Sequence, residues 1–145
     1  MSKKYELTDE TKEVNGHILH RIKALKDFGI IAEGDIGGWV ESEKNLSQKG
    51  MAWVEGEANV YGEARVYGNA SVRGYAHVFE NAKVYGNAYV SGYAFVDGHA
   101  KVYGNALVCG HAMVYDHSTV SGKAWVHGDA HVGSFGRVYG NKEVA

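Results

Sequence analysis

The chain has 145 residues, with 20 glycines, no proline, one cysteine and a formal net charge of −2. Its length fits a single domain, and the near-neutral charge excludes a duplex-DNA binder or a DNA mimic that relies on net charge. A single cysteine excludes an internal disulfide and fits a reducing compartment. Because no stretch approaches the roughly 18 consecutive apolar residues of a membrane span, and no apolar segment follows the first lysines, we expect a soluble cytoplasmic protein without a membrane partner.

The first 47 residues predict a small β cap. Residues 5–8 and 17–25 have the composition of strands, and Asn15-Gly16 between them is the dipeptide typical of a tight hairpin turn. A solenoid needs its core shielded at the end. We therefore expect residues 1–47 to form a hairpin cap on a repeat domain of residues 48–145.

The rest of the sequence repeats with a period of six. Valine occupies every sixth position from Val54 to Val144, with alanine at most positions four after each valine and glycine at most positions two after. In a strand, alanine and valine point to one side and the residue between them to the other, while glycine tolerates the positive φ of a corner. Each hexapeptide therefore predicts one short strand and one corner around a narrow alanine–valine core.

A second period of 18 residues sets the number of sides. Residues 64–69, 82–87 and 100–105 are near copies that read Ala-Arg/Lys-Val-Tyr-Gly-Asn. Three hexapeptides per turn predict a triangular prism in which like residues of successive coils stack at the strand spacing of ~4.8 Å. The outward residues then form three faces, each with its own composition.

This pattern resembles the hexapeptide-repeat superfamily over residues 48–144. The resemblance implies an all-β fold, a single-stranded left-handed parallel β-helix, with a right-handed triangular β-helix as the alternative. Residues 37–41 (Gly-Gly-Trp-Val-Glu) and 45–48 (Asn-Leu-Ser-Gln), together with the Gly-Asn-Ala-x-Val-Tyr repeats, look like those of bacterial and phage proteins often labelled acetyltransferases. A phage-encoded chain would act in the cytoplasm of the bacterial host.

The second of the three faces is basic and rich in tyrosine. Arginine and lysine with tyrosine donors suit phosphate or carboxylate groups, and tyrosine rings can stack on bases. The alternative is that repeats duplicate as units, so that a solvated surface without function was copied with them. The candidate anion-binding residues are Arg65, Lys83, Lys101, Arg137, Tyr67, Tyr85, Tyr103 and Tyr139.

The third face carries large apolar side chains, and the interface candidates are Trp53, Tyr89, Leu107 and Trp125. An exposed apolar patch usually marks an interface, and such aromatic groups are typical interface anchors, so we expect a homo-oligomer. The resemblance favours a trimer, whereas the uncapped C-terminal coil favours an end-to-end dimer. The alternative is that the aromatic columns only stabilise the stacked strands.

The sequence offers little for an enzyme or a metal site. No loop interrupts residues 48–144, and loops are the usual way to build a substrate pocket on a convex prism. We therefore expect no catalytic residue and no cofactor. His99 and His117 stack on adjacent coils, but two imidazoles are too few for a tetrahedral metal site within one chain, so we expect no metal.

Taken together, these patterns favour a non-catalytic, oligomeric binding or scaffold protein. A specific form would be sequestration of a phosphorylated small molecule such as a nucleotide, or of a host protein. One alternative is the CoA-dependent acyltransferase activity that the resemblance implies, with CoA as its cofactor. The other is a self-assembling structural β-helix.

Overall fold

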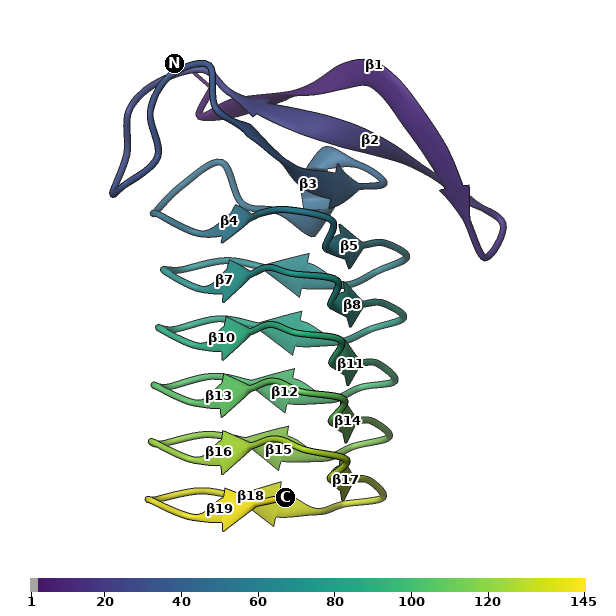
Figure 1. Cartoon of the computed structure of the whole chain (residues 1–145), viewed down its shortest axis with the longest axis vertical. Coiled ribbons are helices and arrows are strands. Elements are labelled where there is room, and N and C mark those ends of the chain that lie inside the picture. The colour runs from purple at the N-terminus through teal and green to yellow at the C-terminus, as the bar shows by residue number, and fades with distance from the viewer. Residues whose placement is uncertain (1–2) are drawn as a thin grey trace.

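The computed structural model describes residues 3–145, which form a stack of parallel β-coils beneath a β-hairpin (Figure 1). Each complete coil consists of three two-residue strands joined by tight corners, so the coils build a prism with one sheet on each side. No helix within residues 3–145 has the length and apolarity needed to cross a membrane.

The three sheets contain every strand of the coils. The first sheet contains β5 (Asn59–Val60), β8 (His77–Val78), β11 (Phe95–Val96), β14 (Met113–Val114) and β17 (His131–Val132). The second contains β6 (Arg65–Val66), β9 (Lys83–Val84), β12 (Lys101–Val102), β15 (Thr119–Val120) and β18 (Arg137–Val138). The third contains β4 (Trp53–Val54), β7 (Ser71–Val72), β10 (Tyr89–Val90), β13 (Leu107–Val108), β16 (Trp125–Val126) and β19 (Glu143–Val144).

The coil winds in the left-handed sense. As the chain descends in Figure 1, strands at the front such as β7 point to the right, and strands behind them such as β12 point to the left. Seen from the N-terminal end, the chain thus turns anticlockwise as it recedes. The predicted left-handed parallel β-helix is confirmed, and the right-handed alternative is wrong.

The N-terminal cap is a hairpin that continues the first sheet. Strand β1 (Tyr5–Val14) pairs antiparallel with β2 (His17–Ala24), which pairs with β3 (Ile36–Val40), and β3 runs parallel to β5. The turn is the predicted Asn15-Gly16, with φ of 50° and 84°. Strand β1 extends beyond the predicted residues 5–8. The prediction was too short because the second half of the strand is mostly polar and faces solvent, so its sequence has no apolar pattern.

The first coil begins within the segment that the sequence assigns to the cap. Trp39 of β3 pairs with Asn59, and Leu46 forms a bridge to Val66 beyond the short 3-10 turn η1 (Glu43–Asn45). Both pairs are 20 residues apart rather than 18. The offset returns to 18 where Trp53 pairs with Ser71, so the two extra residues lie in the corner between Leu46 and Trp53 and shift the earlier strands out of the frame of the repeat valines.

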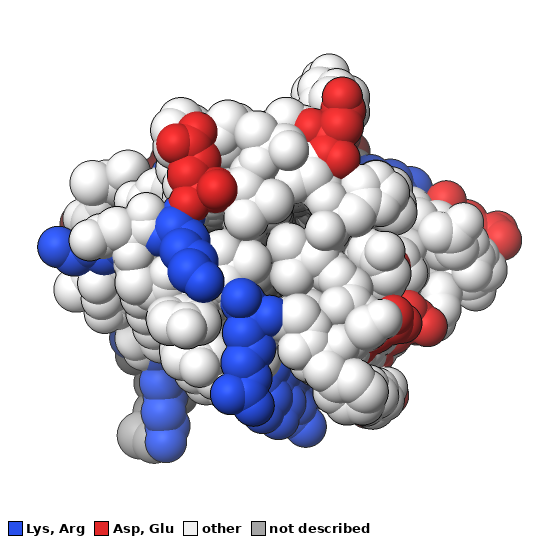
Figure 2. Space-filling view, turned by 90° about the horizontal axis from the view of Figure 1, so that it is seen from below, with Lys and Arg blue, Asp and Glu red and all other residues white. Residues whose placement is uncertain are grey.

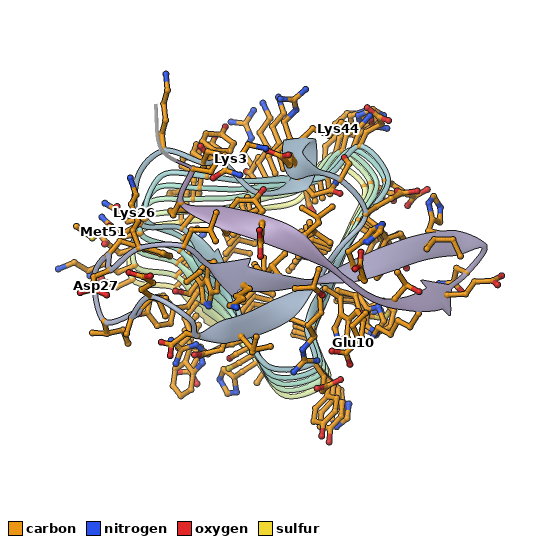
Figure 3. All side chains as sticks on the ribbon, turned by 90° about the horizontal axis from the view of Figure 1, so that it is seen from above. Lys3, Glu10, Lys26, Asp27, Lys44 and Met51 are labelled. Atoms are coloured by element: carbon orange, nitrogen blue, oxygen red, sulfur yellow. The ribbon has the colours of Figure 1, made fainter. Side chains whose placement is uncertain are left out.

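The core is a column of alanine and valine inside the prism. Almost every repeat valine from Val54 to Val126, and almost every repeat alanine, has no exposed surface. Burial of each valine stabilises the fold by roughly 1.5–3 kcal/mol. Ser118 occupies one alanine position, where its buried hydroxyl donates to the carbonyls of Tyr115 and Val132 at 2.7 and 3.0 Å. Figure 3 shows the coils superposed along the axis, with the hairpin across their end.

The corners need positive φ, and three of them have a side chain at the glycine position. Glu80, Asp116 and Ser134 adopt φ of 54–58°, where glycine is normally preferred. Two of these side chains make compensating contacts, since Glu80 Oε1 accepts the Gly98 N–H at 3.1 Å and Asp116 Oδ2 accepts the Ser134 N–H at 3.0 Å. Carboxylates therefore satisfy backbone amides of the next coil at this corner.

Candidate anion-binding face

The outer face of the second sheet carries a column of cations. The strand pairing places Arg65 opposite Lys83, Lys83 opposite Lys101, and Thr119 between Lys101 and Arg137. We call Arg65, Lys83, Lys101 and Arg137 the basic column. Lys83 is half-buried and the other three are exposed. Seen along the coil axis, Lys and Arg side chains of this side lie one behind another at the lower edge of the molecule (Figure 2). The sequence prediction that these four residues share a face is confirmed.

The basic column is not neutralised by carboxylates. The six ion pairs within residues 3–145 involve other cations, for example Lys44 with Glu63 at 2.9 Å and Arg21 with Glu57 at 3.0 Å. Like charges on neighbouring strands repel one another. The face therefore retains an excess of positive charge that an anion would offset.

A stack of tyrosines borders the column on the side of the next corner. The rings of Tyr67 and Tyr85 lie 4.9 Å apart and those of Tyr85 and Tyr103 lie 5.1 Å apart, each pair parallel within 5°. Burial raises the pKa of both Tyr67 and Tyr85, so their hydroxyls stay protonated and can donate to an anion. The stack stops at Ser121, and Tyr139 lies one coil beyond it.

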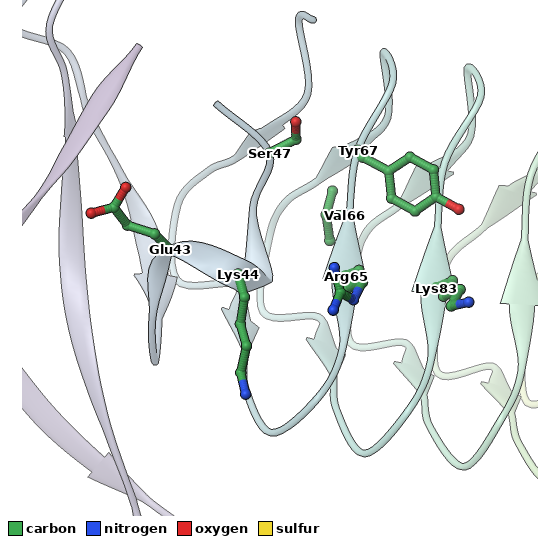
Figure 4. A pocket seen from close by; sticks show the side chains of 7 residues that line it. All are labelled: Glu43, Lys44, Ser47, Arg65, Val66, Tyr67 and Lys83. Carbon is green, nitrogen blue, oxygen red and sulfur yellow. The ribbon is translucent and has the colours of Figure 1, made fainter. Parts of the chain in front are cut away.

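Three open hollows follow this face from the cap to the C-terminal coil. The first, of about 600 Å³, is shown in Figure 4, where Arg65 and Lys83 project from adjacent strands towards it. It is lined by Glu43, Lys44, Ser47, Arg65, Val66, Tyr67 and Lys83. Because Lys44 pairs with Glu63, and Glu43 binds Lys3 at 2.9 Å, Arg65 and Lys83 are the cations in this hollow that lack a carboxylate partner among residues 3–145.

The second hollow, of about 540 Å³, brings the histidine pair next to the basic column. It includes Lys83, Lys101, His99 and His117 in its lining. The two imidazoles stack at 4.9 Å, and His117 stacks on Phe135 at 5.2 Å. No group of three or more His, Cys, Asp or Glu within residues 3–145 is arranged to hold a metal ion. The pair thus borders a groove with hydrogen-bonding and cationic groups.

One interface candidate of the third face is corrected by the structure. Trp53 is only 3% exposed, because the rings of Phe28 and Tyr5 pack edge-on against it at 5.3 and 6.3 Å. It is therefore a core residue of the cap and not an interface residue. Tyr89 and Trp125 are 44% and 42% exposed, and Leu107 between them is half-buried, so the three form a narrower apolar strip.

Sequence reasoning missed two carboxylate contacts, that of Glu143 with His127 and that of Asp97 with Glu80 and Asp116. His127 Nε2 lies 2.6 Å from Glu143 Oε2, beside Trp125, which donates to Cys109 Sγ at 3.3 Å. Asp97 replaces an aromatic residue of the first face, and burial together with nearby carboxylates raises its pKa to about 6. The sequence signal for the carboxylates around Asp97 is that Glu80 and Asp116 stand at positions where the repeat normally has glycine.

We compared the chain with protein families and with curated proteins of known sequence. No family model matches the chain, and no curated protein matches its sequence. The functional argument therefore depends on the geometry and charge of the second face.

Proposed function

We propose that the protein is a non-catalytic binding protein whose basic column binds phosphorylated or other multiply charged small anions. The observation that carries the proposal is the alignment of four cations along open hollows, without carboxylate partners among residues 3–145. Guanidinium and ammonium groups form charge-assisted hydrogen bonds with phosphate oxygens. Tyrosine hydroxyls beside them add neutral donors.

Two features favour binding over catalysis. The hollows are shallow grooves on a regular prism, formed by repeated side chains rather than by an inserted loop. The rigid, in-register strands fix the spacing of the cations, which reduces the ordering cost of binding. Membership of the hexapeptide-repeat superfamily, and with it a cytoplasmic location, is part of the same proposal and is supported by the left-handed coil.

We also propose that copies of the chain associate through the strip of Tyr89, Leu107 and Trp125. Two exposed aromatic rings on one flat sheet are suitable anchors for a protein interface. The strip lies on the third sheet and the basic column on the second. Oligomerisation through it would therefore present several basic faces at once.

Calorimetric titration with inorganic pyrophosphate tests the binding proposal. We expect the double variant Lys83→Gln/Lys101→Gln to bind pyrophosphate at least about tenfold more weakly, because each charge-assisted hydrogen bond contributes about 1.5–3 kcal/mol. The charge-matched control is Lys23→Gln/Lys49→Gln, which removes two exposed lysines outside the basic column. Equal loss in both variants, or no pyrophosphate binding by the wild type at low salt, would overturn the proposal.

A further inference from the structure

The coil that contains β15 differs from the other coils of the second sheet at three positions at once. Thr119 replaces the lysine or arginine of the basic column, Ser121 replaces the tyrosine of the stack, and Lys123 replaces the asparagine that follows the corner. These three positions are neighbours in one coil. Together they remove two long side chains from the face and add a cation at its edge.

The loss of the tyrosine leaves a gap in the aromatic stack. Successive rings in the intact part are 4.9 and 5.1 Å apart. Since Tyr103 and Tyr139 are two coils apart, their ring positions are separated by about 10 Å. Tyr85 illustrates what such a gap accommodates, because it is itself a planar ring held parallel between two others at this spacing.

A hollow of about 530 Å³ occupies this gap. It is lined by Tyr103, Thr119, Ser121, Arg137 and Tyr139. Tyr103 and Tyr139 follow the strands one coil before and one coil after Ser121, and Thr119 and Arg137 come from the strand centres. We call this hollow the Ser121 slot.

The charge around the Ser121 slot is positive. Arg137 lines it, Lys101 lies opposite Thr119 on the adjacent strand, and no carboxylate is among the lining residues. The ammonium group of Lys142 lies 4.7 Å from the centre of the Tyr139 ring. A ligand that has only an aromatic ring would not pair with these cations, and a ligand that has only an anionic group would not stack on the two tyrosines.

We propose that the Ser121 slot binds a nucleotide-class ligand, with its base stacked between Tyr103 and Tyr139 and its phosphates paired with Arg137 and Lys101. Base–aromatic stacking does not depend on the identity of the base. The hydroxyls of Thr119 and Ser121 can hydrogen-bond to its polar edge. This inference rests on the proposed anion binding of the same face, and it adds the ring as the feature that selects the ligand.

The test restores the missing ring. Ser121→Tyr fills the slot with the residue that the other coils of this column carry, so the variant is expected to fold. Ser91→Tyr is a matched control, because Ser91 also lies between a valine and a corner glycine, but at a different corner. Binding of ADP, pyrophosphate and adenosine is measured by calorimetry, and folding is checked by circular dichroism.

We expect the wild type and Ser91→Tyr to bind ADP at least about tenfold more tightly than pyrophosphate, as one stacked base allows. Ser121→Tyr should lose this tenfold advantage and keep its pyrophosphate affinity. Tyr139→Leu, which removes one wall without filling the slot, should weaken ADP binding in the same way. This second variant keeps the proposal testable if Ser121→Tyr folds poorly.

Two outcomes separate this inference from the proposed function. If ADP binds no more tightly than pyrophosphate, or if both serine variants bind ADP equally well, the slot is overturned while pyrophosphate binding through Lys83 and Lys101 stands. If ADP binding depends on Ser121 but pyrophosphate does not bind at all, the general anion-binding proposal fails and the slot remains.

Discussion

Removal of one charge from the basic column should stabilise the protein while it weakens anion binding. Lys83 lies directly between Arg65 and Lys101 on adjacent strands, and none of the three has a carboxylate partner among residues 3–145. Each neighbour repels Lys83 in the unliganded protein. Lys83→Gln removes both repulsions and keeps most of the side chain that packs against the sheet.

The size of the effect depends on the distance between the charged ends, because long side chains of like charge spread further apart than the strand spacing of about 4.8 Å. With charged ends about 7 Å apart in a water-like medium, two neighbours cost about 1.2 kcal/mol before screening. Screening lowers this to about 0.9 kcal/mol at 0.01 M salt and about 0.1 kcal/mol at 1 M. For a chain of 145 residues, an unfolding entropy of about 0.3 kcal/mol/K converts these energies to increases in Tm of about 3 °C and less than about 0.5 °C.

Differential scanning calorimetry across this salt range measures the effect. The control is Lys123→Gln, since Lys123 is exposed and lies between Asn105 and Asn141 in its own column, without a like charge on either side. We expect no salt-dependent gain for it. A lower Tm for Lys83→Gln at low salt, or a gain that does not shrink at 1 M, would refute the reasoning that the column is electrostatically strained.

Two further predictions concern the other faces. Burial and the nearby carboxylates of Glu80 and Asp116 raise the pKa of Asp97 from 3.8 to about 6, so the folded state loses stability as pH rises through this window. Asp97→Asn should therefore raise Tm at pH 7.5 and change it little below pH 3.8. Equal shifts in Tm at both pH values would contradict this cause. Trp125→Glu should reduce the particle mass measured by light scattering to that of a monomer, whereas Tyr139→Glu on the second face should not, and an unchanged mass would exclude the apolar strip as the interface.

The repeat domain could be predicted from sequence because its contacts are set by a fixed spacing. Residues 18 apart pair on adjacent strands, so the alternation of inward and outward positions places every side chain of the coils. The cap does not follow this rule. Trp53 is on the third face by its period, yet Phe28 covers it, and nothing in the aperiodic segment around residue 28 indicates that contact.

The candidate site was predictable to a similar extent. The 18-residue period places the lysines, arginines and tyrosines of the second face in columns, and the structure has them there. Their charge state depends on contacts that periodicity does not describe. Lys44 reaches Glu63 and Arg73 approaches Glu55 at 3.9 Å, whereas the cations of the basic column reach no carboxylate among residues 3–145. Such differences depend on side-chain reach and became visible only in the structure.

Departures from the repeat carry more functional information than the repeat itself. Copying a hexapeptide reproduces its residues regardless of use, whereas a changed residue must be tolerated by its own surroundings. The glutamate at position 80 accepts a backbone amide of the next coil, and the serine at position 118 hydrogen-bonds two buried carbonyls, so both changes are compensated locally. Ser121 instead borders an open hollow between two tyrosines. Because nothing in the fold requires a small residue there, a ligand that needs the space is the most direct physical reason for it.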